Sequence, residues 1–304
     1  MRPEIEQVVE LIQRKDAKSL EDALALLQNT VFSFSMKVCG QRQDAEDTMQ
    51  EVLLKSVPNL PKFDSPKALM VWLYKVAKTR CLMNRRKSKF APKEALSLEE
   101  LMPDRQELER LSGNADPTPE TSLMRRENAK QLREAVQQLP PEYRLILVLH
   151  DMEELSHEDI AEITGLRPGT IRMRLHRARL FVRKELAKAE RDGAPSKPKK
   201  HAAIAQAHPR ERNCKQMFAE LSDYLDEELD DSLCAELEKH MEGCEPCKAF
   251  LASLEETIRT CRTAPPTDHP DEPAAANLRR EVLSKYQELM ANIRRPTASD
   301  INLS

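Results

Sequence analysis

The chain has 304 residues, of which 33% are charged and 4% aromatic, with only six glycines and a formal net charge of −3. Sandwiches and barrels of short strands need more aromatic residues and glycines, so this composition favours long helices divided among two or three domains. No segment approaches the ~20 consecutive apolar residues that span a bilayer, and the first ten residues are acidic, unlike a signal peptide. We therefore expect an all-α, cytoplasmic protein.

Charge is distributed unevenly along the chain. Eight bases and no acid lie in residues 72–93, eight bases and one acid in 167–188, and thirteen acids and three bases in 213–256. Basic segments of this density favour contact with nucleic-acid phosphates, and an acidic module favours a basic partner. The ordinary alternative is that these are solvated helix faces. Because both basic runs lie within amphipathic helices, we expect a nucleic-acid partner and no membrane.

The first predicted elements form a three-helix unit. Apolar residues at helical spacing predict a helix over 20–39, with Gly40 as its C-terminal cap. Asp44 can cap a second helix, which Pro58 ends, and a third helix is expected over 67–89.

Two further groups of helices follow, separated by linkers. Residues 92–119 are acidic and lack a sustained apolar stripe, whereas helical spacing returns over 125–139, restarts at Pro140 and continues in two helices around Gly165. After a second linker, the last predicted pieces are 214–262 and a helix over about 275–293. The expected divisions are two helical domains at 17–93 and 127–189, linkers at 94–126 and 190–212, a small module at 213–262 and a tail at 263–304.

Residues 157–179 have the spacing of a helix-turn-helix. Ala161 allows a close helix crossing, Gly165 suits the turn four residues later, and Ile171 suits the core. A basic second helix of this kind enters the major groove, where arginine contacts guanine edges or phosphates. A basic amphipathic helix packed within a bundle is the alternative. The candidate DNA-binding residues on this helix are Arg172, Met173, Arg174, His176, Arg177 and Arg179.

These motifs resemble those of extracytoplasmic-function RNA polymerase sigma factors. Residues 139–156 with the helix-turn-helix look like domain four, which in that family binds the promoter −35 element. Residues 44–55 resemble the core-binding helix of domain two, and 72–78 with Arg85 and Arg86 resemble the segment that melts and reads the −10 element. Together these stretches cover most of 17–189.

The resemblance implies two sets of site residues and two partners, core RNA polymerase and promoter DNA. One polar helix side would meet the coiled coil of the largest polymerase subunit, and it carries Asp44, Glu46, Asp47, Gln50 and Glu51. The next helix would offer bases to the DNA backbone, namely Lys75, Lys78, Arg80, Arg85 and Arg86.

Several positions depart from the family pattern. Thr79, Met83 and Leu53 replace a frequent asparagine, aspartate and phenylalanine, and Met173 replaces a common serine on the recognition helix. Promoter preference is therefore not transferable. We interpret Trp72 as a core residue rather than a base platform.

A second motif indicates a metal site. His240 and Cys244 share one face of a helix end, and Cys247 completes a Cys-x-x-Cys, so one further ligand closes a tetrahedral zinc shell. Cys214 and Cys234 both compete for that place, and ordinary reduced cysteines are the alternative. Residues 214–247 resemble zinc-containing anti-sigma domains, a match that favours Cys214. We expect structural Zn²⁺ and no catalytic residue.

The remaining cysteines have simpler interpretations. Cys39 and Cys81 lie in apolar helices and are expected to be small core residues, since a disulfide framework is not expected in a reducing compartment. Cys261 is expected to be a free thiol. A thiol–disulfide switch is a secondary hypothesis.

The resulting prediction is a sigma factor, not an enzyme, whose own zinc module modulates it through an intramolecular contact. A linker of roughly twenty residues spans about 25 Å, enough to reach either basic domain. The alternatives are a helix-turn-helix regulator independent of core polymerase and a protein that sequesters another sigma factor.

Overall fold

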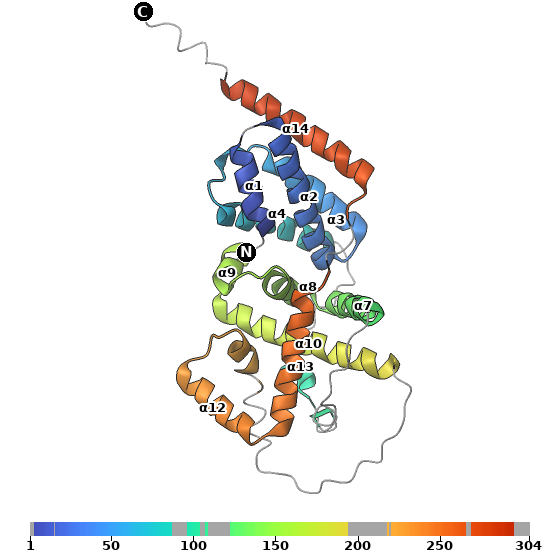
Figure 1. Cartoon of the computed structure of the whole chain (residues 1–304), viewed down its shortest axis with the longest axis vertical. Coiled ribbons are helices and arrows are strands. Elements are labelled where there is room, and N and C mark those ends of the chain that lie inside the picture. Colours follow the sequence, from blue (N-terminus) through green and yellow to red (C-terminus); the bar gives the residue numbers. More distant parts are fainter. Residues whose placement is uncertain are drawn as a thin grey trace, which may run out of the picture. The chain divides into compact units, whose positions relative to one another are not determined.

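The computed structural model describes residues 3–14, 16–86, 96–103, 107–108, 122–193, 218, 220–265 and 269–294. Regular secondary structure in these ranges is helical throughout, which confirms the all-α expectation (Figure 1). The chain forms two compact units. Unit 1 comprises Met1–Ala91, Glu162–Thr164 and Pro266–Ser304, and unit 2 comprises Pro92–Ala161 and Gly165–Pro265.

Unit 1 contains more helix than the sequence predicted. Its elements are α1 (Pro3–Gln13), α2 (Ala17–Cys39), α3 (Arg42–Ser56), the 3₁₀ turn η1 (Leu60–Lys62), α4 (Pro66–Arg86) and α14 (Glu272–Arg294). Helix α1 was not predicted, although Ile5, Val8 and Ile12 are buried at helical spacing.

Capping explains where α2 begins and ends. The Asp16 carboxylate accepts a hydrogen bond from the Ser19 amide at 2.8 Å, and Gly40 ends the helix in the left-handed conformation with φ 82°. The prediction of Asp44 as the next cap was wrong. Helix α3 begins at Arg42 with Gln41 as its N-cap, and Asp44 lies inside the first turn, where its charge still favours the helix N-terminus.

The C-terminal helix α14 packs on α2 and α3 within unit 1 (Figure 1). Ala275, Leu278 and Val282 are buried on its inner face. The fully buried Gln28 of α2 donates to the Ala275 carbonyl at 3.0 Å and accepts from Arg279 at 2.7 Å. This side chain makes polar contacts that fix the position of α14 along α2.

Unit 2 joins the helix-turn-helix to the cysteine-containing module. Its elements are α5 (Leu98–Leu101), α7 (Ser122–Gln138), α8 (Pro141–Leu147), the π-helical turn η2 (Val148–Met152), α9 (His157–Thr164, of which the last three residues group with unit 1), α10 (Pro168–Gly193), α12 (Asp231–Glu242) and α13 (Glu245–Arg262). A further helical segment covers 220–225.

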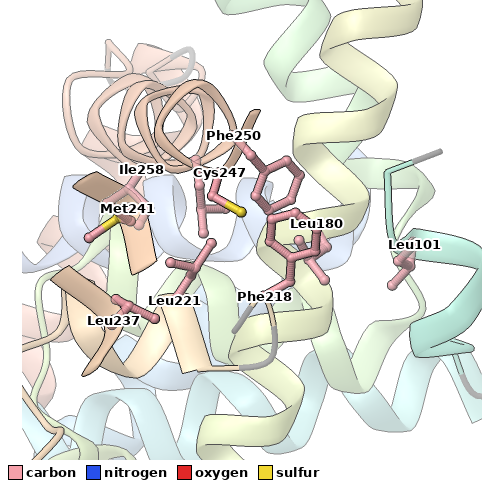
Figure 2. Close-up of a cluster of buried hydrophobic side chains, with 10 residues drawn as sticks. Leu101, Leu180, Phe218, Leu221, Leu237, Met241, Cys247, Phe250 and Ile258 are labelled. Carbon is pink, nitrogen blue, oxygen red and sulfur yellow. The ribbon is translucent and has the colours of Figure 1, made fainter. Parts of the chain in front are cut away.

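One apolar cluster runs through the module and α10 (Figure 2). Phe218 and Phe250 lie with ring centroids 4.6 Å apart, Leu180 of α10 is in the same cluster, and the Arg183 guanidinium stacks 4.4 Å from the Phe250 ring. Leu101 of α5 also joins it. The stretch predicted as a linker without an apolar stripe therefore contributes a short helix to this core.

Cys39 and Cys81 form a disulfide between α2 and α4, with Cα atoms 5.2 Å apart. The expectation that they are separate core residues was wrong, although both are buried. The pairing brings together residues 42 positions apart, so it depends on how α2 and α4 pack and not on local spacing. None of the helices in the described residues is long and apolar enough to cross a membrane.

Removing the disulfide should destabilise unit 1. A bridge over 42 residues restricts the unfolded chain enough to contribute about 4 kcal/mol. We expect the double variant Cys39→Ala, Cys81→Ala to lose up to that amount of unfolding free energy. Trp72, the single tryptophan, packs on Phe63 in unit 1 at 5.6 Å, so its fluorescence during denaturant titration reports this unit.

Cys234→Ser is the matched control, because Cys234 is a free thiol in unit 2. Adding reductant should shift the fluorescence transition of the parent protein and of this control, but not that of the double variant. Equal transitions in all three proteins would contradict a stabilising bridge.

Candidate nucleic-acid interface and metal centre

The predicted helix-turn-helix is formed by α9 and α10. Ser156 caps α9 by accepting from the Asp159 amide at 3.1 Å. Gly165 ends the helix at φ 74°, and its amide donates to the Ala161 carbonyl at 2.8 Å. A Cβ there would meet no atom within 4 Å, so the left-handed backbone alone explains glycine. Pro168 then opens α10, as its fixed φ favours.

One side of α10 has the expected amphipathic pattern. Ile171, Leu175 and Ala178 are buried, whereas Met173 is 43% exposed. Arg172 and Arg174 are partly exposed, and Arg174 pairs with Glu142 of α8 at 2.9 Å. Arg177 is half-buried like these two arginines, so four members of the predicted set on α10 reach the surface at least in part.

The positions of His176 and Arg179 do not fit the expected exposed face. His176 is 6% exposed, and burial, with the neighbouring Arg179 and Arg177, lowers its pKa to about 4. Arg179 is completely buried. Because α10 packs against α8 on one side and α13 on another, more of its surface is covered than a two-sided helix predicts.

Arg179 is held by carboxylates from two parts of unit 2. Its guanidinium donates to Asp151 at 2.6 and 2.9 Å and to Asp226 at 2.7 and 2.8 Å, and it also donates to the Ser222 hydroxyl at 2.7 Å. Burial would by itself raise the pKa of Asp151, but Arg179 holds that pKa well below its usual range. The two carboxylates compensate the buried positive charge of Arg179.

Ser222 and Asp226 belong to an acidic segment, residues 222–228, which we call the acidic turn. This turn also contacts the outer face of α10. Glu228 accepts from Arg172 at 2.9 Å and also bonds His157, the first residue of α9. Its side chain is 26% exposed, and these two bonds lower the pKa of Glu228 although partial burial opposes the shift. The acidic turn therefore contacts Arg172 and Arg179, two arginines that the sequence predicted to bind DNA.

In unit 1 the polar side of α3 faces outward as the sequence predicted. Ala45, Met49 and Val52 are buried, whereas every residue of the expected polymerase-binding set is at least partly exposed, namely Asp44, Glu46, Asp47, Gln50 and Glu51. A groove separates this side from α14, with Glu46, Asp47 and Gln50 on one wall and Asp271, Leu278 and Glu281 on the other.

The basic residues of α4 are spread over its exposed side. Lys75 is exposed, Lys78 is half-buried, and Arg80 pairs with Glu51 of α3 at 3.0 Å. Arg85 and Arg86 belong to α4, but their side chains lie outside the described residues.

Three of the predicted metal ligands converge where α12 meets α13. His240 Nε2 lies 3.2 Å from Cys247 Sγ, and the Cys244 and Cys247 sulfurs are 3.3 Å apart. Two thiolates and an imidazole at this spacing are donors that zinc prefers, so the residues fit a metal. Cys234 is not in this group, since its thiol points to the Leu229 carbonyl. Cys214 lies outside the described residues.

Comparison with protein-family models agrees with this arrangement. The model for Sigma-70 region 2 matches residues 24–90, that for Sigma-70, region 4 matches 129–182, and a zinc-finger model matches 214–248. The fold and the helix-turn-helix thus define a transcription protein of the sigma-70 class, with a zinc-finger region behind it.

Similar proteins identify the family within this class. SigW, an ECF RNA polymerase sigma factor of Bacillus subtilis (strain 168), is 26% identical over 186 residues, which cover 60% of this chain and 96% of SigW. The RNA polymerase sigma-H factor of Pseudomonas aeruginosa is 28% identical, covering 60% and 93%. The RNA polymerase sigma factor SigV of B. subtilis is 30% identical, covering 49% and 80%. The chain belongs to the ECF RNA polymerase sigma factors.

Replacing Asp151 by alanine should destabilise unit 2 by roughly 3 kcal/mol, because a buried arginine loses one of two carboxylates. Chemical denaturation followed by circular dichroism, which unlike Trp72 fluorescence senses unit 2, measures the loss. The exposed Glu158→Ala is the control.

The effect of Asp151→Ala should depend on pH. A carboxyl whose pKa falls on folding stabilises the fold above its unfolded pKa of about 4, and that contribution is lost as the pH decreases towards the folded value. The gap between parent and variant should therefore narrow below about pH 4. A pH-independent gap would show that Asp151 stabilises by packing and not by charge.

Proposed function

We propose that this sigma factor binds core RNA polymerase through α3 and promoter DNA through α4 and α10, and that its C-terminal segment restrains both activities. The observation that carries the proposal is the acidic turn 222–228, which pairs with two arginines of α10, one on the outer face and one buried. We infer the activity from the family to which the chain belongs, and the restraint from the contacts of the acidic turn with α10.

The polymerase contact would use the outer side of α3. Its buried side fixes the helix in the core of unit 1, so the acidic side chains are presented without further rearrangement. Exposed carboxylates suit a basic partner and speed its association. Helix α14 forms the opposite wall of the groove lined by Glu46, Asp47 and Gln50. It would therefore limit the access of polymerase to these side chains of α3.

The promoter contact would use the outer face of α10. Arg172, Met173 and Arg174 project from the first turns of this helix, the part of a recognition helix that contacts base edges in the major groove. Arginine donates to guanine or to phosphate there, and the exposed Met173 side chain suits contact with a thymine methyl group. Lys75 and Lys78 of α4 would bind backbone phosphates.

The zinc module would be held together by structural Zn²⁺. His240, Cys244 and Cys247 would bind the ion, with Cys214 as the fourth ligand that the sequence favours. A closed tetrahedral shell fastens the end of α12 to the start of α13 and contributes folding free energy rather than chemistry. Phe250 and Leu254 follow on α13, so an ordered start of that helix positions the apolar cluster against α10.

The acidic turn would compete directly with DNA. Glu228 forms an ion pair with the Arg172 guanidinium. While this pair is formed, the guanidinium would not be available to a phosphate or a guanine. Tethering in one chain makes the competition intramolecular, so it acts at a high effective concentration.

The first test is transcription with purified core polymerase and a promoter library, comparing the full chain with a truncation after Asp192. The relatives consist almost entirely of the aligned part, so a chain of that length is expected to fold. We expect start-site-specific transcripts from both proteins and several-fold more from the truncation. DNA binding without transcripts would favour a regulator independent of polymerase, and equal transcription would contradict restraint.

A second test addresses the acidic turn in the full chain. Glu228→Ala frees Arg172, and because a partly exposed ion pair contributes up to about 1 kcal/mol, we expect roughly two- to fivefold tighter binding to a promoter selected in the first test. Glu236→Ala, an exposed carboxylate on α12, is the matched control. Unchanged or weaker binding by Glu228→Ala would show that the turn does not mask α10.

A further inference from the structure

A second group of side chains that could hold a metal ion lies at the acidic turn. It consists of His150 in η2, His157 at the start of α9 and Asp226 in the turn, whose ligand atoms all lie within 4.8 Å of one another. The two imidazole rings stack with centroids 4.7 Å apart. The group is distinct from His240, Cys244 and Cys247.

Both imidazoles are oriented by carboxylates. His150 Nδ1 lies 2.9 Å from Asp151, and His157 Nδ1 bonds Glu228. Since ionised carboxylates only accept, the Nδ1 of His157 carries the proton and its Nε2 keeps its lone pair. The Nδ1 of His150 lies between Asp151 and the Arg179 guanidinium, which is 3.2 Å away. A histidine that donates one ring N–H to a carboxylate and offers the other nitrogen has the arrangement found at metal-binding histidines.

His157 adds an independent observation. Its side chain is 4% exposed, yet its Nε2 has no hydrogen-bond partner. A buried polar atom without a partner costs free energy, and a lone pair at that position is satisfied by a cation or by a donor.

The charges around the group favour a cation. Arg179 already binds both oxygens of Asp226, but a carboxylate has about four acceptor positions, so it can also bind an ion. Four carboxylates around the group outnumber two guanidinium groups by two. The charged groups that interact here are Asp151, Asp223, Asp226, Glu228, Arg172 and Arg179.

We propose that His150, His157 and Asp226 form a second metal site, which takes a divalent first-row transition ion of the zinc class. Two imidazole donors favour such ions over calcium or magnesium, which prefer oxygen ligands throughout. A dication would balance the two excess negative charges. Two ligands come from η2 and α9 and one from the acidic turn, so bound metal would fasten the turn to the helix-turn-helix.

The test uses untagged full-length protein that carries one equivalent of Zn²⁺, enough for the cysteine site alone, titrated with Co²⁺ and followed by absorption. We expect one added equivalent with ligand-field bands and without the intense thiolate-to-cobalt charge transfer that ligation by cysteine produces. His157→Gln and His150→Gln should abolish this signal. His269→Gln, an exposed histidine of unit 1, should leave it unchanged.

A positioning role for Glu228 gives a graded readout. Replacement of such a carboxylate typically weakens metal binding 10- to 100-fold, so Glu228→Gln should retain one equivalent at that lower affinity. Hydrogen exchange of the 222–228 amides should slow when Co²⁺ binds the parent protein and stay the same in His157→Gln. Because the readouts are spectroscopic, they remain valid whether or not the chain supports transcription.

Three outcomes would overturn the proposal. The first is no uptake of Co²⁺ beyond the zinc already bound. The second is uptake accompanied only by thiolate charge transfer, which would mean replacement of zinc at the cysteines. The third is an unchanged signal in His157→Gln with circular dichroism like that of the parent, which would assign the ion to other residues.

Discussion

Burial of the Arg179 guanidinium requires partners that compensate its charge, and unit 2 supplies them from both sides of the helix-turn-helix. Arg179 takes Asp151 from the π-helical turn before the helix-turn-helix and Asp226 from the acidic turn after it. Neither carboxylate is adjacent in sequence to the arginine. The acidic turn and His150 both contact this one guanidinium, which ties their positions to α10.

The described residues of the C-terminal third of the chain contribute to the buried cores of both units. Leu180 of α10 is buried with Phe218 and Phe250, and Gln28 of α2 is buried under α14. Each contact combines buried apolar side chains, which stabilise it, with a charged or polar interaction that fixes its geometry. These interactions are Arg183 over the Phe250 ring and Gln28 with Arg279. A basic recognition helix and an acidic turn in one chain thus form complementary surfaces that the segregated charges of the sequence already indicated.

Local patterns predicted local structure well. Gly40 and Gly165 end helices and Pro168 begins one, as expected. The spacing of His240, Cys244 and Cys247 likewise brings three donors together. These features could be predicted because they depend on neighbours within one or two helical turns. The burial of His176 and Arg179 could not be predicted, since it depends on helices packed on both sides of α10. The Cys39–Cys81 bridge and the group of His150, His157 and Asp226 likewise depend on tertiary packing between distant segments.

Sharing one polypeptide has a consequence for how the factor responds to its own abundance. Under the proposed restraint, pairing of Arg172 with Glu228 of the same molecule would be a first-order equilibrium, so the fraction of molecules with an available α10 would not change with protein concentration. A separate inhibitor must be produced in proportion to its target, and any excess of either partner alters the output. In the proposed arrangement the ratio would always be one to one, so higher expression would multiply the number of molecules while the available fraction stays constant.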